Sequence, residues 1–312
     1  MSIEMDDGEE ARYMQILSRR QSLYSAEAIA RCVELDRAIV LHSDFQSALA
    51  AMDRVFQLGR ALTAPAGVRI VGPAGAGKTT LLRYFSESLP PSELFQRGLG
   101  ALHIRVPKIP TLNHMVEAVL SALRYPFARV SHTQVTIKRI TSLEALKAQR
   151  THVLLVDEAH NLCNKGSAGF RGADGGTPAT EYLREIMDQQ IGLVMSGGPG
   201  LLDLKDRDKY LYSRCTAHFE LKSFDFDGDW LGLLHGIAKQ SARHDISLIV
   251  DKKEANRLHR ATAGNLRWLK VLIIEAVLIS TDKKRSALVP ADLLEAFDRS
   301  LGGVKTSANP WA

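Results

Sequence analysis

The chain has 312 residues, of which 45% are hydrophobic and 24% charged, and a formal net charge of +5. This length exceeds what one compact core usually holds, and the composition is that of an ordinary soluble globular protein. All apolar runs are shorter than the roughly 18 residues that a membrane-spanning helix needs. Residues 1–10 are acidic and lack the apolar core of a secretory signal, so we expect a cytoplasmic protein with no membrane partner.

Cysteine content and charge narrow the class of protein only a little. The three cysteines, Cys32, Cys163 and Cys215, are odd in number and widely spaced, which argues against a disulfide framework or a zinc site. The sequence pI near 9.1 is compatible with a nucleic-acid partner. Many basic proteins bind no DNA, so charge alone does not identify that partner.

The first part of the chain alternates between helical and strand-like segments. Residues 1–60 are rich in helix-forming residues with a break near residues 39–43, and Ser43 or Asp44 is placed to cap a helix over residues 45–62. Strands are expected over residues 68–71, 102–106, 152–156, 192–195 and 217–221, with helices over 79–87, 112–123 and 179–189 between them. Residues 124–140 are basic and expected to be irregular, and residues 166–177 are glycine-rich and expected to form a mobile loop. This alternation predicts an α/β fold with a five-stranded, mainly parallel sheet covered on both faces.

From residue 224 onward the pattern is helical only. Helices are expected over residues 230–241, 253–262, 265–279 and 290–301, and Pro290 suits the first turn of the last one. We therefore expect an N-terminal helical extension over residues 1–42, a nucleotide-binding α/β domain over 43–223, a small all-helical lid domain over 224–301 and a flexible tail over 302–312.

A glycine-rich segment follows the first predicted strand and matches the Walker A pattern at every fixed position. Its residues are Gly72, Pro73, Ala74, Gly75, Ala76, Gly77, Lys78 and Thr79, and Thr80 continues it into the next helix. Backbone N–H groups of such a loop cradle phosphates, and the positive end of the following helix faces them. Lys78 is expected to reach the β- and γ-phosphates of ATP, and the Thr79 hydroxyl to bind Mg²⁺. An apolar strand before the loop and a helix after it make a chance glycine turn a poor alternative.

A second motif begins with the apolar strand that ends at Asp157 and Glu158. Its position and spacing fit a Walker B element, in which Asp157 holds Mg²⁺ and Glu158 polarises the attacking water as general base. His160 completes an Asp-Glu-Ala-His string, which also occurs in one class of helicases. About 150 residues follow, roughly half of them in the predicted lid, and this falls short of the second domain that such a helicase needs.

Three further residues are candidates for contact with nucleotide. Ser196 ends a predicted strand and is placed to sense the γ-phosphate, although a serine before two glycines is also common in turns. Arg214 precedes the last strand and is placed to reach a neighbouring subunit's nucleotide as an arginine finger, with Arg207 as competitor. The alternative is a surface arginine that pairs with an acid. Arg267 follows Gly264 and Asn265 in the first turn of a helix, where a cation is disfavoured, and this indicates a phosphate partner, with a solvated arginine as the alternative.

These elements in this order resemble an AAA+ ATPase of the initiator and Cdc6-like branch. Within it the chain resembles the TniB family of ATP-dependent target-DNA regulators of transposons, related to TnsC and more distantly to MuB. The resemblance rests on His42-Ser43-Asp44-Phe45, on the Walker A loop with Val71 before it and Thr80-Leu81-Leu82 after it, on Val156-Asp157-Glu158-Ala159-His160-Asn161-Leu162 and on the C-terminal Asn309-Pro310-Trp311. The glycine-rich residues 166–177 depart from the family pattern.

The resemblance implies a homo-oligomeric ring or filament around duplex DNA, with ATP and Mg²⁺ bound between adjacent subunits. The ATP-bound assembly would recruit a TniA-like transposase, and hydrolysis would disassemble it. Contacts to the DNA backbone would be salt-dependent and largely independent of sequence. The candidates for these contacts are Arg105, Lys108, Arg124, Arg129, Lys138 and Arg139.

Three other functions use the same motifs. A helicase loader would need a replicative helicase as partner and usually a DNA-binding appendage, and the sequence offers no obvious one. A secretion-associated ATPase would be expected to contain a transmembrane or peptidoglycan-binding segment. An interaction protein that binds ATP without hydrolysing it has no need for Glu158 beside the magnesium ligand.

Overall fold

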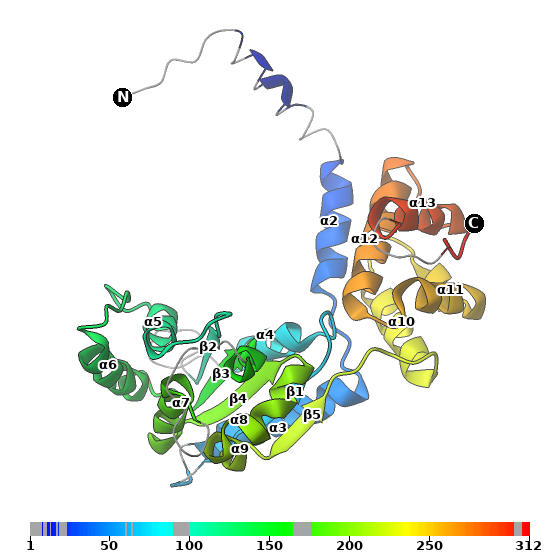
Figure 1. Ribbon diagram of the computed structural model, residues 1–312. Coiled ribbons are helices and arrows are strands. Elements are labelled where there is room, and N and C mark those ends of the chain that lie inside the picture. Colours follow the sequence, from blue (N-terminus) through cyan, green and yellow to red (C-terminus); the bar gives the residue numbers. More distant parts are fainter. Residues whose placement is uncertain are drawn as a thin grey trace. The chain divides into compact units, whose positions relative to one another are not determined.

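The protein is described from a computed structural model (Figure 1). The structure describes residues 24–59, 61–63, 65–89, 100–164, 176–302 and 308–312, together with a few positions before residue 24. The chain divides into two units, one formed by Ser43–Lys222 and the other by Met1–His42 together with Ser223–Ala312. None of the described helices is long and apolar enough to span a bilayer.

The first unit is built on a parallel sheet. Its strands are β1 (Val68–Val71), β2 (Ala101–Arg105), β3 (Val153–Asp157), β4 (Gly192–Gly197) and β5 (Ala217–Glu220). They lie in the order β2-β3-β4-β1-β5, and every neighbouring pair is parallel. All residues of β1, β3 and β4 are buried, as expected for strands covered on both faces. The carboxyl ends of the strands therefore meet at one edge of the sheet, where ligands of such sheets bind.

Helices cover both faces of this sheet (Figure 1). They are α3 (Ser43–Gly59), α4 (Lys78–Ser88), α5 (Leu112–Ala122), α6 (Val135–Ala148), α7 (Pro178–Asp188), α8 (Leu204–Arg207) and α9 (Lys209–Arg214), with the short 3₁₀ segments η1 (Ala159–Cys163) and η2 (Pro199–Asp203). Side chains of α5 and α7 share one buried cluster with alternate residues of β3 and β4. Helices α3 and α4 contact each other and the sheet. The predicted α/β fold with a five-stranded parallel sheet is confirmed.

The prediction that residues 124–140 are irregular is wrong for their second part, because α6 begins at Val135. Only Ser142 and Leu146 of this helix are buried. Ile137 and Ile140 are 69% and 53% exposed, so the apolar residues do not form the single stripe that identifies an amphipathic helix in a sequence.

The second unit is helical. Its elements are α2 (Ala26–Arg37), α10 (Gly228–Gln240), η3 (Ser247–Val250), α11 (Lys252–Thr262), α12 (Leu266–Asp282) and α13 (Pro290–Ser300). Its core contains the fully buried Trp230, Phe297 and Leu272. Leu35 and Cys32 of α2 belong to the same core, and the Cys32 thiol lies 3.6 Å from the carbonyl oxygen of Ile274. Helix α2 is therefore part of this helical unit and not a separate extension.

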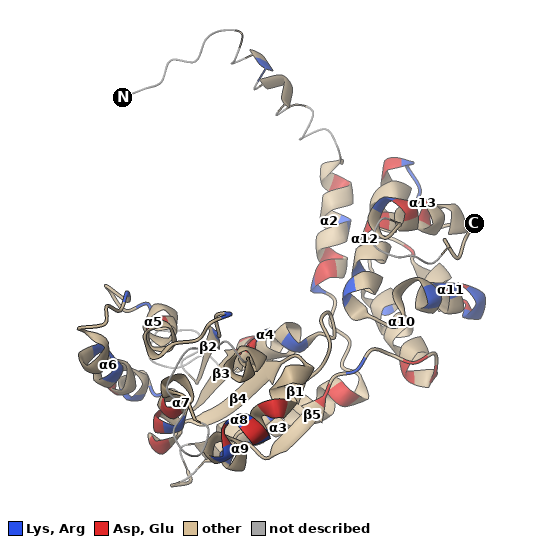
Figure 2. Ribbon diagram, in the orientation of Figure 1, with Lys and Arg blue, Asp and Glu red and all other residues tan. Residues whose placement is uncertain are grey.

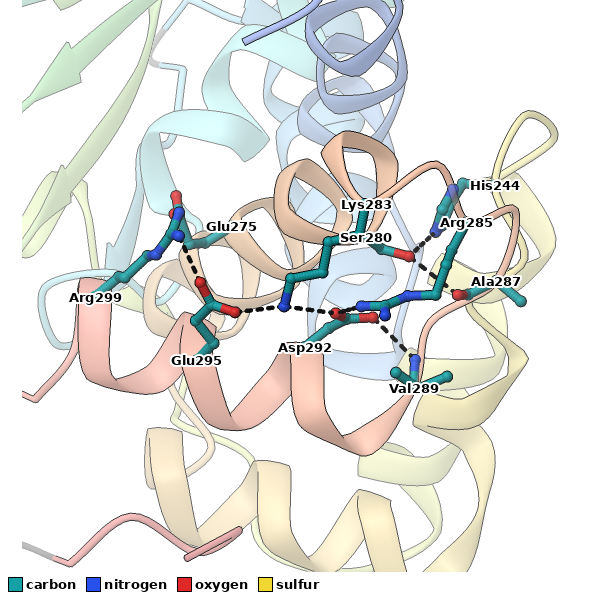
Figure 3. Close-up of polar contacts among 10 residues, drawn as sticks. All are labelled: His244, Glu275, Ser280, Lys283, Arg285, Ala287, Val289, Asp292, Glu295 and Arg299. Carbon is teal, nitrogen blue, oxygen red and sulfur yellow. Dashed lines mark hydrogen bonds and ion pairs between the residues drawn. The ribbon is translucent and has the colours of Figure 1, made fainter. Parts of the chain in front are cut away.

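A buried histidine links three segments of the helical unit. His244 is 3% exposed, and its Nδ1 accepts a hydrogen bond from Nη1 of Arg31 on α2 at 2.8 Å. Because a guanidinium can only donate, the ring proton is on Nε2, which faces Ser280 Oγ at 3.1 Å. The Ser280 hydroxyl in turn donates to the carbonyl of Ala287 at 3.0 Å (Figure 3).

An ion-pair network lies next to this histidine, between α12 and α13 (Figure 3). Asp292 is fully buried, accepts a hydrogen bond from the backbone N–H of Val289 at 3.2 Å and pairs with Arg285. Lys283 lies 3.9 Å from Asp292 and 2.6 Å from Glu295. The buried carboxylate is thus paired and hydrogen-bonded, the condition under which a buried charge is tolerated.

The end of the chain was expected to be a flexible tail, but residues 308–312 pack on the helical unit. Trp311 is 8% exposed, and its indole N–H donates to the Glu254 carboxylate at 2.7 Å. The Asn309 amide donates to the carbonyl of Leu294 at 3.0 Å. Burial of the indole ring explains the difference, because it removes a large apolar surface from water.

Candidate nucleotide-binding site

The glycine-rich loop joins β1 to α4, and its glycines are required by the backbone. Gly75 and Gly77 have φ values of 83° and 90°, in the left-handed region that favours glycine. A Cβ atom on Gly72 would lie 2.3 Å from the carbonyl oxygen of Leu221, so no larger residue fits there. The loop therefore has the backbone geometry that brings N–H groups toward a bound phosphate.

The side chain that contacts this loop is that of Lys78, the first residue of α4. Its Nζ donates to the carbonyl oxygens of Gly72 and Pro73, both at 2.8 Å. This places the ammonium group over the loop and close to the N-terminus of α4. A positive charge and the N-terminus of a helix both favour an anion, so the loop can hold a phosphate chain. Of the remaining predicted loop residues, Ala74 is exposed, Ala76 buried and Thr80 half-buried.

Thr79 and Asp157 meet beside the loop. Thr79 Oγ1 donates to Asp157 Oδ2 at 2.8 Å, and Asp157 Oδ1 accepts the backbone N–H of Glu158 at 2.9 Å. Asp157 is 4% exposed. A hydroxyl and a carboxylate are oxygen ligands of the kind Mg²⁺ takes, so these two side chains fit the predicted magnesium site. With nucleotide bound, Mg²⁺ would neutralise phosphate charge.

Glu158 follows directly and has an unusual backbone. Its φ is 56°, a left-handed conformation that is uncommon for a residue other than glycine. Its carboxylate lies 3.8 Å from Nη2 of Arg105, at the end of β2, and 3.6 Å from Nε2 of His160. The backbone N–H of Gly198 donates to His160 Nδ1 at 3.2 Å, which assigns the ring proton to Nε2, facing Glu158. The predicted general base is thus flanked by a guanidinium and an imidazole N–H.

The structure changes the interpretation of two residues. Arg105 was predicted as a DNA contact, and it lies beside Glu158 because β2 pairs with β3 in a register that sets Arg105 opposite Asp157. In the sequence His160 stands out only as part of the Asp-Glu-Ala-His string, whereas its ring lies between Glu158 and the end of β4. Only the pairing of β2 with β3 could have indicated the contact of Arg105.

Ser196 lies on β4, between the strands that carry the two motifs. Its neighbour across the sheet is Ile70 of β1. The hydroxyl oxygen is buried and has no hydrogen-bond partner among the residues that the structure describes. A buried polar group without a partner is unfavourable, so this hydroxyl fits a position where a phosphate oxygen or a water would satisfy it. Its role as a phosphate sensor stays a prediction.

Arg214, the predicted arginine finger, ends α9 and is tied to α7. Its Nη1 lies 2.6 Å from Asp188 Oδ1 and donates to the carbonyl of Arg184 at 3.1 Å. The side chain is 40% exposed. The competitor Arg207 ends α8 and is half-buried. To act on another subunit, Arg214 would have to leave Asp188, and this role stays a prediction.

Arg267 belongs to the helical unit, where the fold accounts for the residues before it. Gly264 has a φ of 67°, and a Cβ there would lie 1.8 Å from the carbonyl oxygen of Phe224. Asn265 caps α12 by accepting the backbone N–H groups of Arg267 and Trp268 at 3.1 and 3.3 Å. The side chain of Arg267 is exposed, and its contact with nucleotide stays a prediction.

Positive charge is concentrated between β2 and β3. Residues 105–150 contain eight Lys or Arg and two Glu, a net charge of +6, whereas the whole chain has +5. Of the predicted DNA contacts, Lys108, Arg124 and Arg129 are exposed and pair with no carboxylate in the described part of the chain. Arg139 instead donates to Glu185 at 2.6 Å, and Lys138 binds two backbone carbonyls. Of the predicted glycine-rich loop, residues 166–175 lie outside the described residues.

Comparison with known proteins agrees with this geometry. Residues 65–204 match the family model described as an AAA domain. No curated protein matches the sequence. The fold resembles the ORC2 protein of Aeropyrum pernix in its ADPNP and ADP complexes, with a TM-score of 0.61 and 14% identity over 83% of this chain and 68% of that one.

Two further solved structures are similar. Cdc6p of Pyrobaculum aerophilum has a TM-score of 0.56 and 15% identity over 83% of this chain and 68% of that one. ORC1 of Aeropyrum pernix, in complex with DNA, has a TM-score of 0.56 and 15% identity over 83% of this chain and 66% of that one. The chain therefore has the AAA+ fold, and its glycine-rich loop lies within the residues that match the AAA domain.

Proposed function

We propose that this chain is an ATPase switch that assembles on duplex DNA and regulates the choice of target by a transposase, as its resemblance to the TniB family implies. The proposed binding to DNA rests on the concentration of positive charge between β2 and β3, in the unit that also contains the glycine-rich loop. A regulator of this kind must couple nucleotide state to DNA binding, and Arg105, at the start of this basic segment, lies 3.8 Å from the predicted general base Glu158.

The ATPase part rests on four side chains. Lys78 lies over the phosphate loop, and Thr79 and Asp157 lie side by side where magnesium is expected. Glu158, one residue further, accepts a proton from the attacking water in the proposed reaction. Arg105 Nη2 at 3.8 Å and His160 Nε2 at 3.6 Å are neighbours of this carboxylate.

The DNA part predicts a backbone contact. The exposed Lys108, Arg124 and Arg129 would neutralise phosphates without reading bases, which makes binding depend strongly on salt. Supporting cases are the ORC2 protein in its ADPNP and ADP complexes and the ORC1 protein in complex with DNA, which have the same fold. A TniA-like transposase is the partner that the TniB resemblance adds.

The test is assembly on duplex DNA, followed by light scattering and electron microscopy with ATP, a non-hydrolysable analogue and ADP. Rings or filaments on DNA with ATP or the analogue, and their loss with ADP, are expected. Lys78→Ala is the matched control, since it removes the phosphate contact and should leave the protein unassembled in every nucleotide. A protein that hydrolyses ATP yet ignores DNA in all nucleotide states would contradict the proposed role in transposition. Stimulation of the transposase by the assembled protein then tests the partner.

A further inference from the structure

An aromatic side chain projects from the turn between α5 and α6. Phe127 is 90% exposed, more than any other large apolar side chain that the structure describes. Its φ is 61°, a left-handed conformation that strains a bulky L residue. Neither the exposure nor the backbone conformation helps the protein to fold. Residues held in such a strained conformation cluster at functional sites, so the backbone of Phe127 together with its exposure points to a binding role.

The turn is held in place from both sides. Helix α5 ends with two hydrogen bonds, from the N–H of Arg124 to the carbonyl of Ser121 at 3.0 Å and from the N–H of Tyr125 to that of Leu120 at 2.9 Å. This is the Schellman pattern, with Arg124 in the left-handed position at a φ of 55°. The chain therefore leaves α5 in a fixed direction.

Helix α6 braces the other side of the turn. Lys138 Nζ donates to the carbonyl of Phe127 at 2.6 Å and to the carbonyl of Arg129. Pro126 restricts the backbone immediately before the aromatic residue. The phenyl ring is thus presented on a braced turn, which lowers the entropy that binding has to overcome.

The charge around the ring indicates what it contacts. Arg124 and Arg129 are exposed on either side of Phe127, and residues 118–143 contain no Asp or Glu. The ribbon between α5 and α6 carries basic residues (Figure 2). An apolar ring between two arginines matches a base step between two phosphates, because wedge residues enter such a step while arginines contact the backbone.

We propose that Phe127 is a wedge that enters a base step of duplex DNA, with Arg124 and Arg129 on the flanking phosphates. This inference rests on the proposed function, because it names the contact by which the chain holds DNA. Insertion of Phe127 would deform the duplex, whereas the arginines alone would contact only the DNA backbone. The protein would therefore favour DNA steps that unstack easily.

The experiment uses the full chain with ATP and a duplex that carries 2-aminopurine, whose fluorescence rises when a base unstacks. Binding of the wild-type protein should raise this fluorescence. Phe127→Ala should lose most of the rise and bind about tenfold more weakly, with an unchanged dependence on salt, because it removes stacking and no charge. Arg124→Ala should instead lower the salt slope by about one. Ile137→Ala is the matched control, since Ile137 is 69% exposed on α6, and it should behave as wild type.

Three outcomes would overturn the wedge. DNA binding by wild type without a rise in fluorescence, and unchanged by Phe127→Ala, leaves the proposed function intact and removes the wedge. Loss of self-association in Phe127→Ala with full DNA affinity identifies a contact between protein copies instead. Failure of the wild-type protein to bind DNA in any nucleotide state contradicts the proposed function as well, which distinguishes the two failures. Nucleotide binding by each variant confirms that it is folded.

Discussion

Glu158 is the residue on which the proposed hydrolysis depends, and its surroundings allow a sharp test. Glu158→Gln preserves shape and the neighbouring Asp157 but cannot accept a proton from water. We expect ATP binding to be retained and turnover to fall by about 10²- to 10⁴-fold, the usual range for loss of a general base. Equilibrium binding of a fluorescent ATP analogue and single-turnover hydrolysis measure the two effects separately.

Lys78→Ala is the natural comparison, because its ammonium group lies over the phosphate loop. This variant should lose nucleotide binding itself, so the two variants separate binding from chemistry. Turnover at the wild-type rate in Glu158→Gln would show that another group is the base.

How much of the candidate site could be predicted from the sequence depends on which contacts are local. Lys78 and Thr79 belong to one continuous loop whose spacing defines its chemistry, and Asp157 and Glu158 follow one strand. The contact between Arg105 and Glu158 depends on the register of β2 against β3, which no short segment of the sequence specifies. The contact of the predicted base with Arg105 can therefore be identified only in the folded sheet.

At the scale of single elements, His244 makes the helical unit sensitive to acid. Burial and the nearby Arg31 lower the pKa of His244 below its ordinary value of 6.5, against the opposing charges of Asp292 and Asp245. In the folded protein its Nδ1 accepts from Arg31, so protonation would replace a hydrogen bond by repulsion between like charges. The unfolded chain therefore binds this proton more readily than the folded one.

The sign of the stability change follows from that difference. Above pH 6.5 the histidine is neutral in the folded and the unfolded state, so it does not change the free energy of unfolding. As the pH drops below 6.5 toward the lower pKa of the folded state, the free energy of unfolding decreases. One proton contributes a slope of at most about 1.4 kcal/mol per pH unit. Hydrogen–deuterium exchange of α2 and α12 between pH 7.5 and pH 5 measures this, and His244→Gln should show a smaller change. Equal pH dependence in both proteins would assign the effect to other groups.

The C-terminal residues are the second element with a testable role. Trp311 packs near Phe297, with 6.3 Å between ring centroids, and its indole N–H satisfies the buried Glu254. Trp311→Ala should destabilise the helical unit by about 3 kcal/mol, as buried Trp→Ala changes commonly do. Trp311→Phe keeps most of the packing and loses only the donor, so it should cost less. Thermal unfolding measures both, and an unchanged melting temperature in Trp311→Ala would mean that the contact adds no stability in solution.

Helices and strands were predictable to different degrees, for physical reasons. The five strands lie within two residues of their predicted positions, because continuous apolar runs next to turn residues are a strong local signal. Helix α6 was missed because Ile137 and Ile140 point into solvent and break the apolar stripe. Trp311 was assigned to a flexible tail because its partner Glu254 lies far away in the sequence. Pairing between distant segments leaves no periodic pattern in either of them.

At the scale of the whole molecule, the proposed assembly requires that neighbouring copies share a nucleotide site. The side chain of Arg214 is 40% exposed and is therefore accessible to a neighbouring copy. It pairs with Asp188, so it would have to break this ion pair before it could contact the neighbour's nucleotide. A head-to-tail arrangement, in which one face of each copy meets a different face of the next, is the kind that forms rings and filaments. Each copy would then contribute Glu158 to its own site and Arg214 to the next.

Mixing two inactive variants tests this sharing directly. Glu158→Gln keeps Arg214 but cannot turn over ATP, and Arg214→Ala keeps Glu158 but lacks the arginine, so each alone should bind ATP and hydrolyse little. In a random mixed assembly about a quarter of the head-to-tail interfaces join an intact Glu158 to an intact Arg214. We therefore expect an equal mixture to recover roughly a quarter of the wild-type rate, as measured by phosphate release on duplex DNA. If Arg214 acts on its own subunit's nucleotide, the mixture stays inactive. If Arg214→Ala alone turns over at the wild-type rate, Arg214 is not the finger, and Arg207→Ala is the next variant to mix.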